Sequence, residues 1–201
     1  MQNLINYKLA TILTIISCTT TYAQVTFDDP VFIPTVESSW SLTTGDFNND
    51  NYPDVALAGF GGDFAVHIND KNGGFLPMTL HDTGMTQGAG SVAADFNNDG
   101  WDDLAFNGHD ASSLSIMINN QDGTFAAPAL YISGQRGWNV HAADLNHDNW
   151  IDIVSCDILV DTINVFLNNQ DGTFAPYVGY GVNSGAMDCA IADLNADGHP
   201  D

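Results

Sequence analysis

Basic residues are almost absent from this chain. Its 201 residues include three Lys and Arg against 25 Asp and Glu, so the formal net charge at pH 7 is −22. Contacts with nucleic-acid phosphates need Lys and Arg, and this composition therefore argues against a nucleic-acid partner. Glu is nearly absent too, since Glu37 is the one Glu among the acids. The remaining acids are Asp, a poor helix former but a good turn and metal-ligand residue.

Long apolar segments are also lacking. The apolar run at residues 9–16 (LATILTII) follows Lys8 and is far shorter than the ~20 residues that span a bilayer, so no transmembrane span is expected. Polar residues and TYA at 21–23 follow it, which predicts a secretory signal peptide over residues 1–23. The alternative is a bacterial lipoprotein signal that places a lipid on Cys18. Either signal predicts a secreted or cell-surface protein.

An acidic nine-residue loop recurs at a constant interval of 49 residues. It occupies residues 46–54, 95–103, 144–152 and 193–201 (DFNNDNYPD, DFNNDGWDD, DLNHDNWID and DLNADGHPD). Self-similarity at a fixed period is typical of propellers and other repeat architectures. Asp recurs at positions 1, 5 and 9 of all four loops, which turn chemistry alone does not demand. Simple Asp/Asn-rich turns are therefore the weaker interpretation.

Strand patterns surround each loop. Alternating segments precede it at 91–95, 140–144 and 189–193, and runs rich in β-formers follow it at 54–58, 103–107 and 152–156. Further alternating segments run into the turn sequence NNQDG at 119–123 and 168–172. Four short strands per repeat predict an all-β fold of four-stranded antiparallel β-propeller blades.

The length sets the expected number of blades. Residues 24–201 hold about three complete blades plus part of a fourth, and the segment 25–33 is expected to be a displaced outer strand. Propellers have 4–8 blades, and a seven-bladed ring at this period needs roughly 340 residues. We therefore expect the sequence to be the N-terminal part of a longer propeller.

Side-chain oxygens stand at alternate positions of the acidic loop. Positions 1, 3, 5 and 9 supply carboxylates or amides and position 7 a backbone carbonyl, an all-oxygen set that suits Ca²⁺ better than Mg²⁺. Gly100 at position 6 permits a positive φ, and Asn51 and Asn149 are expected to substitute for it. An EF-hand is excluded because position 12 carries no acid and the flanking segments are strands.

The loops and strands together resemble FG-GAP/VCBS-type repeats, the blades of the integrin α-subunit propeller and of many secreted bacterial proteins. The motif D-x-[DN]-x-[DN]-G-x-x-D carries the resemblance, which covers nearly all of residues 24–201. It implies up to four structural Ca²⁺ ions, with position 7 binding through its carbonyl. The implied ligands are Asp46, Asn48, Asp50, Tyr52, Asp54, Asp95, Asn97, Asp99, Trp101, Asp103, Asp144, Asn146, Asp148, Trp150, Asp152, Asp193, Asn195, Asp197, His199 and Asp201.

The same resemblance implies a binding or adhesion scaffold for an extracellular protein or glycan. The face opposite the loops, built from connections such as residues 132–139, is expected to meet the partner through Arg136 and Trp138. For Trp138 packing between blades is favoured, because Trp40 occupies the equivalent position, six residues before its loop. The alternatives are a propeller lectin that stacks sugars on the aromatic residues at loop position 7, or the non-catalytic propeller of a larger secreted polysaccharide-degrading enzyme. No catalytic motif is present, so this chain is expected not to be an enzyme.

Two cysteines remain after the signal peptide, Cys156 and Cys189. Their positions in the 49-residue repeat place them at the same height in neighbouring repeats, and in an oxidising compartment they can pair. Two buried, unpaired thiols are the other interpretation, and the sequence leaves both open. A zinc site is not expected, because no close Cys or His pairs accompany them.

Overall fold

The computed structural model describes residues 32–109 and 112–200. The predicted signal peptide with Cys18, nearly all of the expected outer strand at 25–33, and Asp201 lie outside these residues. Ile33–Asp201 form one compact unit, and its described residues contain strands and no helix. Accordingly, the described part of the chain has no helix with the length and apolar character needed to cross a membrane.

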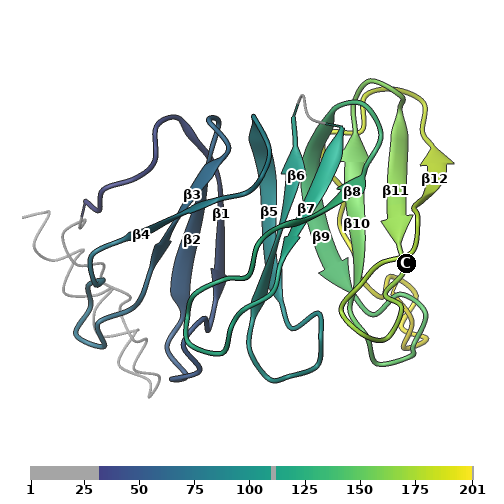
Figure 1. The fold of residues 1–201 in the computed structure, drawn as a ribbon. Coiled ribbons are helices and arrows are strands. Elements are labelled where there is room, and N and C mark those ends of the chain that lie inside the picture. Colours follow the sequence, from purple (N-terminus) through teal and green to yellow (C-terminus); the bar gives the residue numbers. More distant parts are fainter. Residues whose placement is uncertain (1–31, 110–111, 201) are drawn as a thin grey trace, which may run out of the picture. The chain divides into compact units, whose positions relative to one another are not determined.

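Within residues 32–109 and 112–200, twelve strands form three four-stranded antiparallel sheets, and each sheet follows the order of the chain (Figure 1). The first sheet contains β1 (Ser39–Gly45), β2 (Asp54–Gly59), β3 (Asp63–His67) and β4 (Thr79–Asp82). The second contains β5 (Gly88–Ala94), β6 (Asp103–Gly108), β7 (Ser113–Met117) and β8 (Ala129–Ile132). The third contains β9 (Gly137–Ala143), β10 (Asp152–Asp157), β11 (Thr162–Phe166) and β12 (Val178–Gly181). The predicted all-β fold of four-stranded blades is confirmed.

The predicted strand at 189–193 is wrong. This segment has no strand, whereas its counterparts at 91–95 and 140–144 lie largely within β5 and β9. A strand needs a neighbouring ladder to satisfy its backbone groups. In the first three repeats that ladder is the strand after the acidic loop, and no such strand of the fourth repeat lies among the described residues.

The first strands of the three blades, β1, β5 and β9, pack side by side (Figure 1). Because strand direction alternates within each blade, the acidic loops and the turns between the third and fourth strands share one end of the sheets, here called the loop end. The turns between the second and third strands and the connections between blades share the other end, here called the crossing end. The two ends therefore differ in the residues that they present.

Aromatic packing joins each blade to the next at the loop end. Phe47 and Phe96, at loop position 2, are completely buried. Phe125, from the NNQDG turn of the second blade, contacts Phe47 edge to face with ring centroids 5.7 Å apart, and Phe174 of the third blade contacts Phe96 at 5.6 Å. Such pairs contribute roughly 0.5–1.5 kcal/mol beyond the area that they bury. Each blade thus covers the acidic loop of the blade before it.

Candidate metal loops

The acidic loops share one hydrogen-bonding scheme, shown here by the second loop. The Asp95 carboxylate accepts the backbone N–H groups of Asp99 at 3.0 Å and Gly100 at 2.8 Å. Asn97 Oδ1 accepts the N–H of Asp99, and Asp99 Oδ1 accepts the N–H of Trp101, both at 3.0 Å. The same bonds recur in the other three loops. The side-chain oxygens of positions 1, 3 and 5 thus hold the loop backbone in a tight turn by accepting its N–H groups.

At position 6 of the loop, Asn takes the backbone conformation of Gly, as the sequence predicts. Gly100 and Gly198 have φ values of 89° and 88°, and Asn51 and Asn149 have 66° and 67°. Asn enters this left-handed region more readily than most residues. The loop therefore keeps one backbone path in all four repeats despite two different residues at this position.

Position 9 is a completely buried carboxylate in the three loops where it is described, at Asp54, Asp103 and Asp152. Asp103 accepts the backbone N–H of Phe96 at 3.0 Å through one oxygen and that of Asn119 at 2.7 Å through the other. Asp54 and Asp152 make the matching pairs of bonds. The residue therefore ties the start of its own loop to the turn that follows the third strand.

These buried carboxylates are under electrostatic strain. Burial and, to a smaller extent, the negative charges of Asp99 and Asp95 raise the pKa of Asp103 to about 7, although the two backbone N–H donors oppose the shift. The pKa values of Asp54 and Asp152 are raised for the same reasons. Positions 1, 5 and 9 thus repel one another, and a cation among them relieves that repulsion.

A side chain from the NNQDG turn, or its counterpart in the first blade, contacts the outer oxygen of position 5. Gln121 Nε2 lies 3.1 Å from Asp99 Oδ2, and Gln170 Nε2 lies 3.1 Å from Asp148 Oδ2. In the first blade the equivalent residue is Lys71, whose Nζ lies 3.1 Å from Asp50 Oδ2. The structure describes this partner in the first three loops. Of these three, the first loop is the one in which a positively charged side chain, Lys71, lies beside the carboxylates.

An asparagine of the same turn reaches the preceding blade. Asn119 Nδ2 donates to the Phe47 carbonyl at 2.9 Å and to the Asp102 carbonyl at 3.1 Å. Asn168 makes the same pair of bonds one repeat later, to Phe96 and Ile151. The sequence pattern marks the NNQDG segment only as a turn. Its recurrence in step with the acidic loop is the signal that could have identified these residues as part of the loop structure.

The donor set fits a hard cation, but the side chains do not converge on one point. Among the residues that the structure describes, no three His, Cys, Asp or Glu side chains are arranged to hold a metal ion. The cause is local, because the carboxylate oxygens face backbone N–H groups. Oxygens with a second free lone pair, such as those of Asp95 and Asp99, have capacity left for a cation. The calcium ligands therefore stay a prediction.

The remaining predicted site residues have distinct surroundings. Tyr52 is 45% exposed with Lys71 Nζ 5.3 Å from its ring centre, whereas Trp101 and Trp150 are half-buried. In the fourth loop the ring of His199 meets that of His147 from the third loop, with centroids 4.2 Å apart. Trp138 packs against Trp40 with centroids 5.7 Å apart, so the favoured inter-blade packing is confirmed.

Comparison with known families settles the class of repeat. The sequence model of the FG-GAP-like repeat family matches residues 46–106 and again residues 95–155, together more than half of the chain. The chain belongs to the FG-GAP-like repeat family. The two matches begin at position 1 of the first and second acidic loops, and each ends within the strand after the next loop, β6 or β10. A comparison with curated protein sequences gives no significant match.

Solved structures are similar to this FG-GAP-like protein to different degrees, and the first of the two below shares its fold. A lectin from Agrocybe aegerita, in a structure describing its specific recognition of non-reducing terminal N-acetylglucosamine, matches 69% of this chain at 21% identity with a TM-score of 0.51. A structure of the Photorhabdus luminescens Tc holotoxin pore matches 79% of this chain at 16% identity with a TM-score of 0.46. The matched regions are 37% and 8% of those chains, so this chain spans well under half the length of either.

Replacing Asp103 by Ala tests the structural role of position 9. The change leaves the buried N–H groups of Phe96 and Asn119 without acceptors, at roughly 1–3 kcal/mol each. We expect the free energy of unfolding in a calcium chelator, measured with urea, to fall by a few kcal/mol. Asp122→Ala is the control, because it removes only exposed bonds from the N–H and hydroxyl of Thr124, and it should lower the value by less than about 1 kcal/mol. If the free energy of unfolding of Asp103→Ala equals that of the wild-type protein, Asp103 does not have the proposed structural role.

Replacing Lys71 by Gln tests the electrostatics of the first loop. The change removes the ammonium group beside Asp50 and replaces it by the neutral Gln side chain that contacts position 5 in the second and third loops. Since that group disfavours a bound cation, we expect calcium to bind the first loop several-fold more tightly, as measured by isothermal titration calorimetry. The reciprocal change, Gln121→Lys, should weaken binding at the second loop. Equal affinities in all three proteins would show that Lys71 does not influence the loop.

Proposed function

We propose that the protein is a calcium-binding propeller scaffold in which each acidic loop holds one Ca²⁺ ion. The recurrence of one loop geometry with the same oxygen-bearing residues carries this proposal. Positions 1, 5 and 9 supply three carboxylates per loop, and burial, with a smaller contribution from the charges of positions 1 and 5, raises the pKa of position 9. One Ca²⁺ leaves the three carboxylates of such a loop with a net charge near −1. Four ions would together add +8 to the formal net charge of −22.

The role of calcium in this proposal is structural. Ca²⁺ accepts six to eight oxygen ligands in flexible geometry, which suits a loop that mixes carboxylates, amides and a backbone carbonyl. Binding to the folded state alone adds about 1.4 kcal/mol to the free energy of unfolding for each loop at a tenfold excess of calcium over its dissociation constant. A blade whose loop is loaded therefore resists local opening at the loop end.

The scaffold acts outside the cell and binds an extracellular protein or glycan. The signal-like segment at residues 1–23 supports export, and so does the acidic composition with 25 Asp and Glu, which suits a calcium-rich exterior. The likeness in fold to the N-acetylglucosamine-recognising lectin makes a propeller lectin the second candidate. An adhesion role and a role as the non-catalytic part of a larger enzyme use the same scaffold and differ in the partner.

Calcium titration of thermal unfolding tests the proposal. The protein from Gln24 onward is melted with calcium varied from chelated to millimolar, followed by circular dichroism. Three loaded loops should raise the melting temperature by roughly 10 °C. Asp95→Ala combined with Asp144→Ala should remove a corresponding part of that increase, while Asp122→Ala combined with Asp171→Ala should keep it. A flat response to calcium would mean that the loops are turns without a metal.

A further inference from the structure

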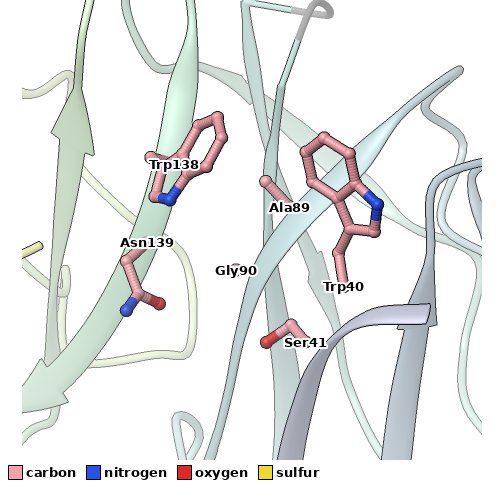
Figure 2. A pocket seen from close by; sticks show the side chains of 6 residues that line it. All are labelled: Trp40, Ser41, Ala89, Gly90, Trp138 and Asn139. Carbon is pink, nitrogen blue, oxygen red and sulfur yellow. The ribbon is translucent and has the colours of Figure 1, made fainter. Parts of the chain in front are cut away.

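A pocket of about 520 Å³ opens at the crossing end, on the side opposite the acidic loops. It is lined by the first strands of all three blades through Trp40, Ser41, Ala89, Gly90, Trp138 and Asn139. These residues occupy only two positions of the repeat, six and five residues before the loop Asp. Figure 2 shows the two indoles on either side of Ala89, with Ser41 and Asn139 further along the same strands.

The differences between repeats create this pocket. At the position six residues before the loop, the first and third blades carry Trp and the second carries Ala. The small Ala89 lets Trp40 and Trp138 approach one another across the intervening blade to a centroid separation of 5.7 Å. At Gly90 a Cβ atom would lie 2.7 Å from the Asn139 Cα and the Trp138 carbonyl oxygen, so Gly is required for this close approach.

The walls of the pocket are held in place by neighbouring side chains. Trp40 contacts Phe60 with centroids 4.6 Å apart, and the ring of His109 contacts both indoles at 5.4 and 5.1 Å. Trp40 nevertheless remains 47% exposed. The indoles are therefore supported from behind and accessible from the pocket.

The polar groups of the lining are also fixed. Ser41 Oγ accepts the backbone N–H of Ser91 at 3.0 Å and hydrogen-bonds the Ser91 hydroxyl at 2.8 Å. Asn139 Nδ2 donates to Asp188 at 2.8 Å, and its Oδ1 accepts the N–H of Val140 at 3.0 Å. The Asn139 amide retains a second N–H and a second lone pair for a ligand. Directional polar groups thus accompany the aromatic wall.

We propose that this pocket is a carbohydrate-binding site for a neutral sugar of about disaccharide size. A pyranose ring presents an apolar C–H face, which packs on indole, and hydroxyl groups at its edge, which hydrogen-bond hydroxyl and amide side chains. The lining contains no charged side chain, and the net charge of −22 disfavours anions. Its volume lies in the range of ordinary ligand pockets. The inference rests on the proposed scaffold function and gives the glycan alternative a site at the crossing end rather than at Tyr52, Trp101 and Trp150.

A quaternary ammonium ion is the competing ligand, since aromatic rings and negative charge attract cations. The sugar is favoured because Ser41 and Asn139 offer hydrogen-bonding groups that an ammonium without N–H groups cannot use. Choline therefore serves as the discriminating probe in the experiment below.

The test is a titration of tryptophan fluorescence and of binding heat with cellobiose, lactose, maltose and N,N′-diacetylchitobiose, in calcium and in chelator. At least one sugar should bind saturably. Trp138→Ala, which removes one wall, and Ala89→Leu, which fills the floor but keeps both indoles, should each weaken that binding at least tenfold. Tyr180→Ala, at an exposed position on β12, is the aromatic control and should bind as the parent protein does.

Several results would overturn the site. These are no saturable binding of any of the four sugars, displacement of the sugar by choline, or loss of binding in Trp150→Ala with retention in Trp138→Ala and Ala89→Leu. Each variant is first melted beside the parent protein, and if one variant fails to fold, the binding measured with the other decides. If melting depends on calcium but no sugar binds, the sugar site is rejected and the calcium scaffold stands. If a sugar binds but melting does not respond to calcium, the calcium scaffold is rejected and the sugar site stands.

A separate observation concerns the cysteines. Asp188 Oδ1 accepts hydrogen bonds from Asn139 Nδ2 at 2.8 Å and from the Cys189 N–H at 2.9 Å, and lies 2.7 Å from His141 Nε2. This carboxylate therefore docks the fourth repeat onto β9, the neighbour of β10. Cys156 lies in β10 at an irregularity of the β9–β10 register, between Ser155, which pairs with Val140, and Asp157, which pairs with Gly137. It therefore stands opposite the part of β9 that holds Asn139, the residue to which Asp188 is bonded. Both cysteines are free in the structure, the first buried and the second half-buried.

We infer that Cys156 and Cys189 form a disulfide that fastens the fourth repeat to the third blade. The half-buried Cys189 thiolate attacks a small-molecule disulfide such as oxidised glutathione, forms a mixed disulfide and releases one thiolate. The Cys156 thiol then loses its proton and attacks the Cys189 sulfur, which releases the second thiol and closes the protein disulfide. Cys189 is the first nucleophile because it is partly exposed whereas Cys156 is buried, and the neighbouring Cys156 lowers the pKa of Cys189.

Peptide mapping of the full chain after incubation with oxidised glutathione tests this bond. We expect a linked peptide containing Cys156 and Cys189, lighter by two hydrogens than its reduced parts. The oxidised protein should melt several degrees above the reduced one, and Cys189→Ser and Cys156→Ser should each remove that difference. The inference would be overturned by free thiols at both positions, by a link to Cys18, or by links between two chains. Equal melting temperatures with the linked peptide present would reject the fastening role.

Discussion

The structure depends on buried carboxylates that accept two backbone N–H groups from distant parts of a blade. Asp54, Asp103 and Asp152 are each fully enclosed, where an ion without partners would be expensive. Each finds its partners at the start of the acidic loop and at the turn after the third strand. Because one side chain needs both segments in place, the loop and the outer hairpin form together. The proposed calcium ions and the fold therefore draw on the same carboxylates.

Contacts between blades extend this coupling along the chain. Asn119 and Asn168 donate to carbonyl groups of the preceding acidic loop, and Phe125 and Phe174 cover the buried Phe of that loop. Each blade thus completes the one before it, as in other repeat proteins whose stability is a sum of nearest-neighbour terms. A change at one acidic loop consequently reaches the next blade through a few defined bonds.

The repeats are much more alike at the loop end of the blades than at the crossing end. At the loop end the repeats are nearly identical, because every copy must satisfy the same set of backbone donors. At the crossing end they differ, and the row of Trp40, Ala89 and Trp138 shows how the difference makes a pocket. The repeated residues therefore build the loop end of every blade, and residues that differ between repeats build the pocket at the crossing end, where we propose that a sugar binds.

Much of this was predictable because the signals are local. The period of 49 residues, the strands that flank each loop and the Asn substitutions at position 6 all follow from alternation, turn chemistry and backbone preference within short segments. The prediction of a strand at 189–193 was wrong because the described residues contain no strand after the fourth loop with which this segment could pair. The structural roles of Asn119, Gln121 and their counterparts were missed because a turn sequence does not show what the turn touches.

The sequence by itself determined the fold class, the repeat and the chemistry of the acidic loops, since these depend on spacing along the chain. Only the tertiary structure decided which residues from different repeats meet. Trp40 and Trp138 lie two repeats apart and come together over Ala89. Asp188, the neighbour of Cys189, binds Asn139 and His141 of β9, the strand that pairs with the β10 strand of Cys156. Such contacts are set by the packing of one blade on the next, which no pattern within a single repeat contains.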